Sequence, residues 1–225
     1  MKHVVMAIMA HPDDAELRCF GTLCKYQENG FNCVVLIISN GENGISLNEK
    51  SRGKKCLHAN TRYAESEMAF KNTGIKTKML NFTDGSISTN MDLIIAIEEQ
   101  INYYKPEIIL THYPDEFCAD HQDHYSVGRA TINCATRAES VKKILLCEPQ
   151  MTMRSKFIPN CYIDITQYFD RKIVALSCHN SQKGRFYLEE RYQKTKALFF
   201  ASSVAFSLAK NNKKYEAFHI LFCSE

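Results

Sequence analysis

A histidine and two adjacent aspartates follow the first apolar run of the chain. The run covers residues 3–10, and residues 11–16 then read HPDDAE. Adjacent carboxylates repel each other and resist desolvation, so they do not help a chain to fold. Capping of a helix N-terminus would explain one or both aspartates, but it would not explain His11. A bound cation would explain all three, so this segment indicates a metal or catalytic site.

A second group of ionisable residues follows the short apolar run at residues 108–111. Residues 112–124 read HYPDEFCADHQDH and hold three of the eight histidines of the chain. On a helix, His121 and His124 would lie on one face, one turn apart. Asp123 stands between them and could orient an imidazole through its ring N–H. A solvated acidic loop with surface histidines is the alternative interpretation.

Both segments leave expected strands, so they can converge at the carboxyl edge of one parallel sheet, where such sheets bind ligands. Two histidines and one carboxylate are a common ligand set for a catalytic Zn²⁺, which keeps its fourth position for water. The ion lowers the pKa of that water toward about 7 and polarises a carbonyl. A spare carboxylate can take the proton, and a spare histidine can protonate a leaving amine or stabilise an oxyanion. The residues alone therefore indicate a metal-dependent hydrolase of an amide or ester.

The elements that must position these segments alternate between strands and helices. Apolar runs of strand length are followed by stretches of helical spacing. We expect strands at residues 3–10, 33–39, 78–82, 108–111, 143–147, 161–165 and 217–223. We expect helices at residues 16–28, 60–71, 91–104, 122–138, 167–178 and 184–210. Residues 40–60 are polar and contain glycine, which predicts a long loop.

This alternation predicts an α/β fold. With 225 residues, 45% of them hydrophobic and 24% charged, the chain has an ordinary globular composition. We expect a single domain over residues 1–225, with a Rossmann-like, mostly parallel sheet covered by helices on both faces. We see no internal repeat, low-complexity tract or linker that would divide it.

Charge, hydropathy and cysteine placement argue against several other classes. A net charge of +3, from 28 Lys and Arg against 25 Asp and Glu, is too balanced for a nucleic-acid or anionic-membrane partner. We expect no membrane span, because no apolar run reaches ~20 residues, and no signal-peptide pattern opens the chain, so we expect a cytoplasmic protein. The ten cysteines form no Cys-x-x-Cys pair and several lie in apolar runs, which favours free thiols over disulfides.

The two ionisable segments together resemble the PIG-L/LmbE-like family of zinc-dependent N-acetylglucosamine deacetylases. The resemblance extends along most of the chain through weaker motifs in the same order. These motifs are Gly21-Thr22, Arg62-Tyr63-Ala64-Glu65, Asp84-Gly85, His179-Asn180-Ser181-Gln182 and Glu216-Ala217-Phe218. The resemblance implies removal of the acetyl group from a small-molecule amino sugar conjugate, with Zn²⁺ as cofactor. It also implies a homo-oligomer, because family members often form trimers or hexamers.

The resemblance also implies a role for individual residues. The residues that match metal ligands are His11, Asp14 and His124. Asp13 matches the general base that takes a proton from the zinc-bound water. His121 matches the histidine that stabilises the oxyanion or protonates the amine, with Asp123 orienting it. The residues expected to contact substrate are Arg62, Glu16 and His179.

Arg18 and Phe20 depart from the family pattern, because members often carry small residues at these positions. We expect the two side chains to reshape the pocket and leave the metal ligands unchanged. Two other functions remain open: a sugar-binding or regulatory protein without turnover, and a metal hydrolase of a non-sugar amide or ester. The spare base Asp13 favours an enzyme. His112 could have a purely structural role or could support the metal ligands from behind. The sequence also does not specify which divalent metal is bound.

Overall fold

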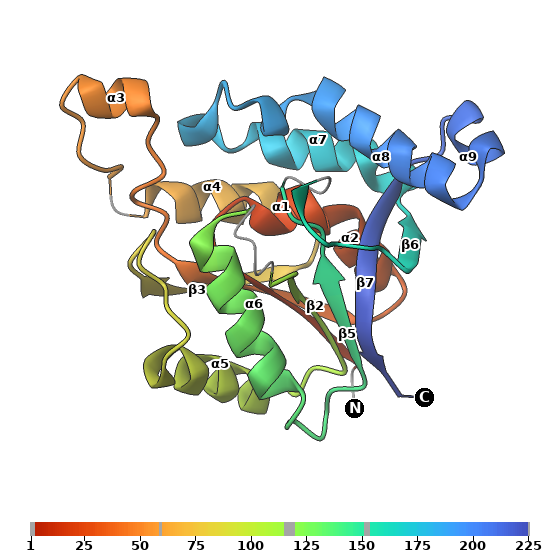
Figure 1. Ribbon diagram of the computed structural model, residues 1–225, viewed down its shortest axis with the longest axis horizontal. Coiled ribbons are helices and arrows are strands. Elements are labelled where there is room, and N and C mark those ends of the chain that lie inside the picture. Colours follow the sequence, from red (N-terminus) through yellow and green to blue (C-terminus); the bar gives the residue numbers. More distant parts are fainter. Residues whose placement is uncertain (1–2, 59, 115–119, 151–153, 225) are drawn as a thin grey trace.

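The computed structural model describes residues 3–58, 60–114, 120–150 and 154–224, which form one central sheet with helices on both faces (Figure 1). The strands of the sheet are β1 (Val4–Met9), β2 (Asn32–Ser39), β3 (Lys76–Phe82), β4 (Ile108–His112), β5 (Lys143–Cys147), β6 (Cys161–Asp164) and β7 (Tyr215–Cys223). They lie in the order β3-β2-β1-β4-β5-β7-β6. Each expected strand overlaps one of these, and the predicted α/β fold is confirmed.

The helices differ from the expected ranges at three places. The α-helices in the described residues are α1 (Asp14–Arg18), α2 (Phe20–Glu28), α3 (Leu47–Ser51), α4 (Thr61–Phe70), α5 (Met91–Tyr104), α6 (Gln122–Ala135), α7 (Phe169–Ser177), α8 (Glu190–Val204) and α9 (Phe206–Lys210). The first expected helix is broken at Cys19, whose ψ is 16°. The last begins only at Glu190 and breaks at Ala205, where the backbone is extended.

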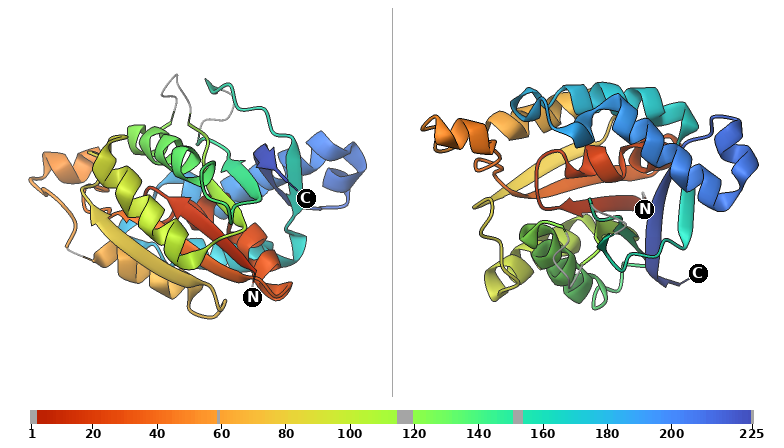
Figure 2. Two further views of the ribbon diagram at one scale, coloured as in Figure 1. Left: turned by 90° about the horizontal axis from the view of Figure 1, so that it is seen from below. Right: turned by 45° about the horizontal axis from the view of Figure 1, so that its top comes forward.

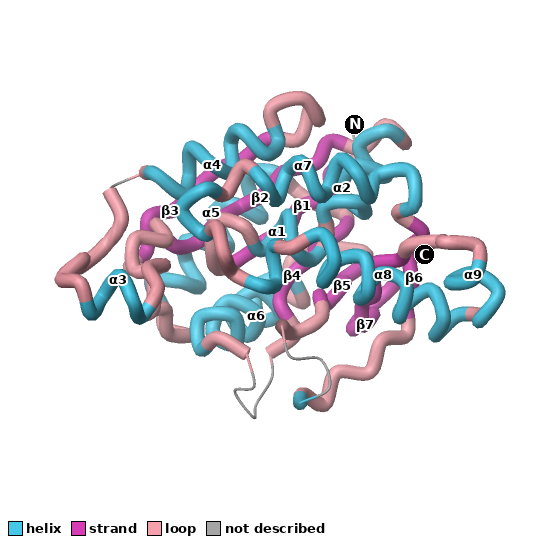
Figure 3. Tube along the Cα trace, turned by 90° about the horizontal axis from the view of Figure 1, so that it is seen from above, coloured by secondary structure: helices cyan, strands magenta, loops and turns pink. Residues whose placement is uncertain are grey.

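Helix α3 lies inside the segment that we expected to be a loop throughout. A capping box starts it: Ser46 Oγ accepts the backbone N–H of Glu49, and the Glu49 carboxylate accepts the backbone N–H of Ser46. This Ser-x-x-Glu spacing is visible in the sequence and is a known helix start signal. Figure 3 shows that α3 lies at one end of the molecule and α9 at the other.

Both faces of the sheet are apolar, as expected for a sheet covered on two sides. Along β1, Val5, Ala7 and Met9 point into the core that contains residues of α2, α4 and α7. The intervening residues Met6 and Ile8, and Ala10 just after the strand, point into the core formed with α5 and α6. Figure 2 shows these two helical layers on opposite sides of the sheet. Side chains alternate along a strand, so one continuous apolar run fills both cores.

The topology places the two ionisable segments side by side. Strand β1 lies between β2 and β4 and is parallel to both, with Ile8 opposite Thr111. The chain first extends the sheet from β1 through β2 to β3 and then returns to the other side of β1. The carboxyl ends of β1 and β4 therefore flank a switch point, where open α/β sheets bind their ligands.

The carboxyl-terminal part of the sheet is antiparallel. Strand β7 pairs antiparallel with both β5 and β6. The sheet is thus mostly but not wholly parallel, as predicted. No helix in the described ranges is long and apolar enough to span a membrane.

Candidate metal centre

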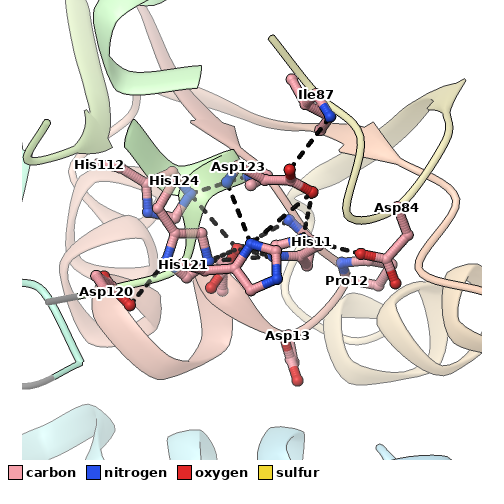
Figure 4. Close-up of polar contacts among 12 residues, drawn as sticks. His11, Pro12, Asp13, Asp84, Ile87, His112, Asp120, His121, Asp123 and His124 are labelled. Carbon is pink, nitrogen blue, oxygen red and sulfur yellow. Dashed lines mark hydrogen bonds and ion pairs between the residues drawn. The ribbon is translucent and has the colours of Figure 1, made fainter. Parts of the chain in front are cut away.

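Three donor atoms from three elements meet at the switch point (Figure 4). His11 follows β1, Asp14 begins α1 and His124 lies in the first turn of α6. His11 Nδ1 lies 3.1 Å from His124 Nε2 and 3.4 Å from Asp14 Oδ2. Asp14 Oδ2 lies 3.2 Å from His124 Nε2, which closes a triangle. The residues predicted as metal ligands are therefore brought together.

This triangle has the size that a small divalent ion requires. Nitrogen and oxygen ligands at about 2.0–2.1 Å from a tetrahedral Zn²⁺ lie about 3.3 Å apart. The three observed separations run from 3.1 to 3.4 Å. All three side chains are at least nine-tenths buried. The donor set and its spacing therefore fit a tetrahedral ion with one open position.

The second nitrogen of each imidazole is held by carboxylates. His124 Nδ1 lies 3.0 Å from Asp120 Oδ1. His11 Nε2 lies 3.1 Å from both Asp123 Oδ2 and Asp84 Oδ1. Metal-binding histidines nearly always give their other N–H to such a partner, which fixes the ring. Both rings therefore direct their other nitrogen, Nδ1 of His11 and Nε2 of His124, at the same point.

The charges at the site favour an added positive charge. Burial lowers the pKa of His11, but Asp123, Asp14 and Asp84 raise it more, and the net pKa is well above the usual value. Burial raises the pKa of Asp14, but His124 and His112 hold it well below its usual range. The pKa values of His11 and His124 are both raised, so these two imidazoles in their protonated form stabilise the buried carboxylates. A divalent ion can take the place of these protons.

Asp13 is turned away from the three donor atoms by an unusual backbone. Its φ is +117°, a strained value for a residue with a side chain. Its Oδ2 pairs with Arg62 Nη2 at 2.8 Å, and both side chains line the same cavity as the donors. Burial raises the pKa of Asp13, whereas Arg62 lowers it. The strained turn therefore gives the adjacent aspartates separate places. Asp14 lies in the triangle, and Asp13 points away from it (Figure 4).

Asp123 lies near His121, but the expected hydrogen bond from the His121 ring to its carboxylate is not formed. Asp123 is fully buried, and its carboxylate accepts the backbone N–H of Gly85 at 2.7 Å and of Ile87 at 3.2 Å, besides contacting His11. His121 Nδ1 lies 3.9 Å from that carboxylate and instead accepts the backbone N–H of Asp123, which caps α6. Asp123 is positioned to orient His11, because α6 starts one residue after His121 and turns the carboxylate toward β1.

The capping bond leaves His121 with one free ring nitrogen. Since Nδ1 accepts a hydrogen bond, the neutral ring carries its proton on Nε2. The side chain is 45% exposed and lines the cavity, with its ring edge-on to His11 at 4.6 Å. Burial, followed by the nearby His11, lowers the pKa of His121. His121 can therefore offer a proton toward the cavity.

The three expected substrate contacts lie in two different places. Arg62 lines the cavity, where it holds Asp13. Glu16 and His179 are 1% and 2% exposed, do not line that cavity, and bond each other at 2.9 Å. Ser66 Oγ completes this buried group by donating to Glu16. Burial on this scale places Glu16 and His179 in the support of α1 and α4 rather than in the cavity wall.

Three residues near the site received no assigned role from the sequence. Asp84 and Asp120 hold the ligand histidines, as described above. His112 stacks on His124 with ring centroids 4.1 Å apart, and its Nε2 accepts the backbone N–H of Ala10 at 2.9 Å. Burial, aided by His124, lowers the pKa of His112 to about 3. His112 is therefore a neutral side chain that packs behind the ligands, at the carboxyl end of β4.

Only one of the two unusual residues after the first motif reaches the cavity. Arg18 lines it, while Phe20 is 1% exposed and packs against Phe70 in the core, with ring centroids 5.4 Å apart. The cavity has a volume of about 780 Å³, within the range of small-molecule sites. Away from the donors, its wall includes Asn43, Gly44, Ser86, Gln182, Arg185 and Tyr187. It is a polar pocket that suits a hydroxylated ligand.

The fold and site define an α/β protein with a His–Asp–His cluster suited to a metal ion at the switch point of its sheet. The chain belongs to the PIG-L family: the family pattern described as GlcNAc-PI de-N-acetylase matches residues 6–135. The family resemblance expected from the motifs is thereby confirmed.

Individual proteins similar to this chain include enzymes of two kinds. A probable N-acetyl-alpha-D-glucosaminyl L-malate deacetylase 2 of Bacillus cereus is 26% identical over 205 residues, which cover 87% of this chain and 90% of the relative. The uncharacterized deacetylase YaiS of Escherichia coli is 30% identical over 183 residues, which cover 79% of this chain and 90% of the relative. The solved structure of GalB, the 4-carboxy-2-hydroxymuconate hydratase of Pseudomonas putida, has a TM-score of 0.83 at 19% identity and covers 100% of this chain and 98% of that one. This structural likeness supports the fold.

Proposed function

We propose that the protein is a zinc-dependent N-deacetylase of an N-acetylglucosamine-type amino sugar conjugate. The observation that carries the proposal is the place of Asp13, a spare carboxylate beside three converging donors. A protein that only binds a sugar has no use for such a base. The family and the named deacetylases among its relatives support the same reaction.

A divalent ion held by His11, Asp14 and His124 would supply Lewis acidity, polarising the amide carbonyl and lowering the pKa of a water molecule. Asp13 accepts the proton of the attacking water. Burial raises the pKa of Asp13 above its usual value, and the charge of Arg62 opposes part of that rise. The proton on Nε2 of His121 is available to the oxyanion or to the leaving amine. These residues together supply the parts of amide hydrolysis.

The decisive experiment measures acetate and free amine released from a panel of N-acetylglucosamine conjugates with neutral and acidic aglycones. We expect release by the metal-loaded protein, loss after chelation and recovery with added Zn²⁺. The panel also includes a carboxylated alkene, because a hydratase shares the fold. Hydration of the alkene without any amide cleavage, or amide release that survives chelation, would overturn the proposal.

The ligand assignment has its own test. His11→Ala, Asp14→Ala and His124→Ala should each lose most of about one bound ion per chain, because each removes one corner of the triangle. His3→Ala is the matched control, since His3 pairs with Glu107 and is not part of the cluster. Full metal content in all three ligand variants would refute the assignment.

We further propose a cytoplasmic homo-oligomer that acts on a small molecule. Nine cysteines in the described ranges are free, which suits a reducing compartment; Cys118 lies outside the described residues. Phe199, Val204 and Phe206 of α8 and α9 are 53%, 47% and 79% exposed. Light scattering of the purified chain tests the assembly, and a monomer at micromolar concentration would refute it.

A further inference from the structure

Arg18 is a buried cation inside the candidate metal centre that the proposed reaction does not use. Its side chain is 3% exposed and ends α1 at the cavity wall. The guanidinium reaches Asp14 on the same helix, Asp120 before α6, and the backbone carbonyl of Glu148 after β5. Its Nη2 also lies 3.2 Å from His124 Nδ1. Burial of a guanidinium is costly unless its charge and N–H groups are used. The four contacts therefore need an explanation.

Arg18 divides the two oxygens of Asp14. Its Nε lies 3.5 Å from Asp14 Oδ1. The other oxygen, Oδ2, faces His124 Nε2 at 3.2 Å and His11 Nδ1 at 3.4 Å. With Oδ1 facing the guanidinium, Asp14 presents one oxygen to an ion.

Arg18 also holds the carboxylate that orients His124. Asp120 Oδ2 accepts a hydrogen bond from Arg18 Nη2 at 3.1 Å, and Asp120 Oδ1 lies 3.0 Å from His124 Nδ1. Because Asp120 fixes Nδ1, the opposite nitrogen, Nε2, faces Asp14 and His11. Arg18 thus reaches this ligand in two ways: directly, with Nη2 3.2 Å from His124 Nδ1, and through Asp120.

We propose that Arg18 is a positioning residue of the metal centre, which holds Asp14 as a one-oxygen ligand and, through Asp120, turns Nε2 of His124 toward the ion. The inference rests on the ligand set proposed above. An unpaired positive charge here would repel a cation and weaken its binding. The guanidinium is instead paired with two carboxylates, so its removal frees both of them. Arg18 therefore strengthens metal binding.

The test is a Co²⁺ titration of the metal-free protein, because the visible absorption of bound Co²⁺ reports both occupancy and coordination number. Arg18→Met should bind Co²⁺ about 10–100-fold more weakly than wild type, the usual loss when a group behind a metal ligand is removed. The spectrum should also change, since Asp14 can then bind through both oxygens. Arg18→Lys keeps the charge but not the planar fork, so its affinity should fall as well.

A double-mutant cycle tests the route through Asp120. If Arg18 acts through Asp120, the variant with both Arg18→Met and Asp120→Asn loses less affinity than the product of the two single losses. Arg137→Met is the matched control, because Arg137 is exposed and pairs with Glu98 on the surface. Thermal melting of the metal-free proteins separates weak metal binding from a lost fold.

Each outcome decides the proposal. Wild-type Co²⁺ affinity and spectrum in both Arg18 variants would overturn it, and so would tighter binding by Arg18→Met. Independent losses in the cycle would overturn the route through Asp120. If Arg18→Met does not fold, the Co²⁺ affinity and spectrum of Arg18→Lys decide between these outcomes. A wild-type protein that binds no Co²⁺ would instead overturn the metal centre itself, which is a different result.

Discussion

Asp13 and Asp14 are chemically identical neighbours that a single backbone angle sends to different places. The positive φ of Asp13 turns its side chain to Arg62, while Asp14 begins α1 and faces the two histidines. An L-residue in this region costs about 1–3 kcal/mol, which the surrounding contacts must offset. The separation of a ligand from a base is therefore built into the turn that follows β1.

Asp13→Asn should keep the metal and remove the base. The amide retains the shape of the carboxylate but cannot take a proton from water. We expect kcat to fall by roughly 10²–10⁴-fold with KM nearly unchanged. Metal content and steady-state kinetics on a turned-over conjugate measure the effect. A near-wild-type kcat would place the base elsewhere, and loss of the metal would make Asp13 a ligand.

At the residue scale, the sequence predicted which residues form the site better than it predicted their partners. The family resemblance named His11, Asp14 and His124 as metal ligands, and the structure places their donor atoms 3.1 to 3.4 Å apart. The partners of the imidazoles were not predicted, because Asp84 and Asp120 are ordinary loop carboxylates until the loops fold over the sheet. Pairing of residues this distant depends on packing, which local spacing does not encode.

At the element scale, helix α6 carries His124 close against β4 because one of its residues is glycine. A Cβ on Gly128 would lie 2.5 Å from the backbone carbonyl oxygen of His112. Contact this close leaves no room for a methyl group. Gly128 follows His124 by one helical turn, so its packing sets where that ligand sits.

Gly128→Ala should therefore weaken metal binding through the position of α6. Overpacking of this kind costs about 1–3 kcal/mol of stability, and the shifted helix should also pull His124 out of the triangle. Metal affinity and melting temperature of the metal-free protein measure the two effects. Asn133→Ala, at an exposed position of the same helix, is the control. Wild-type metal affinity in Gly128→Ala would show that the helix position does not control the site.

Helix α2 depends on a buried ion pair instead of a side-chain cap of its own. The Glu216 carboxylate accepts the backbone N–H groups of Gly21 and Thr22 and pairs with Lys172 Nζ at 2.8 Å. Both charged side chains are nearly fully buried, at 3% and 4% exposed. The closing strand and α7 are thereby tied to the start of α2. The contact thus joins two segments that are 194 residues apart in the sequence.

Lys172→Met should destabilise the protein by about 3–5 kcal/mol, because it leaves the Glu216 charge buried without its partner. The preceding residue supplies the control: Arg171 pairs with Glu28 at the surface, and Arg171→Met should cost at most about 1 kcal/mol. Urea unfolding of both variants measures the difference. Equal losses would mean that burial does not distinguish the two pairs.

At the scale of the whole molecule, local periodicity predicted the sheet and its coverage. Each expected strand was a run of apolar residues, and such a run can be recognised without knowing which elements pack around it. The breaks at Cys19 and Ala205 were not predicted, since apolar spacing continues through both. The antiparallel insertion of β7 between β5 and β6 was not predicted either, because strand order depends on packing between distant elements.

The cysteines test the fold and the expected reducing compartment together. Cys56 and Cys223 are exposed, whereas Cys24, Cys33 and Cys134 are buried in the two cores. Burial raises the pKa of Cys24 and Cys33 to about 12 and that of Cys134 to about 11. These buried thiols should remain protonated at neutral pH. Only the thiolate reacts readily, so burial lowers the reactivity of these thiols in two ways: it blocks access of reagents, and it keeps the thiols protonated.

Thiol titration without reductant should find all ten cysteines free in unfolded protein, and only Cys56 and Cys223 fast-reacting in folded Cys118→Ser protein at pH 8.

The raised pKa values also fix the direction of alkaline instability. An unfolded thiol loses its proton near pH 9, before a folded one does, so this contribution to the free energy of unfolding is intact below pH 9 and is lost between pH 9 and about 12. Urea unfolding at several pH values measures it, with Cys24→Ser/Cys33→Ser as the control that should flatten the dependence. Protected thiol pairs in the unfolded protein would reverse the expectation of a reducing compartment, and stability that rises above pH 9 would contradict the burial of these thiols.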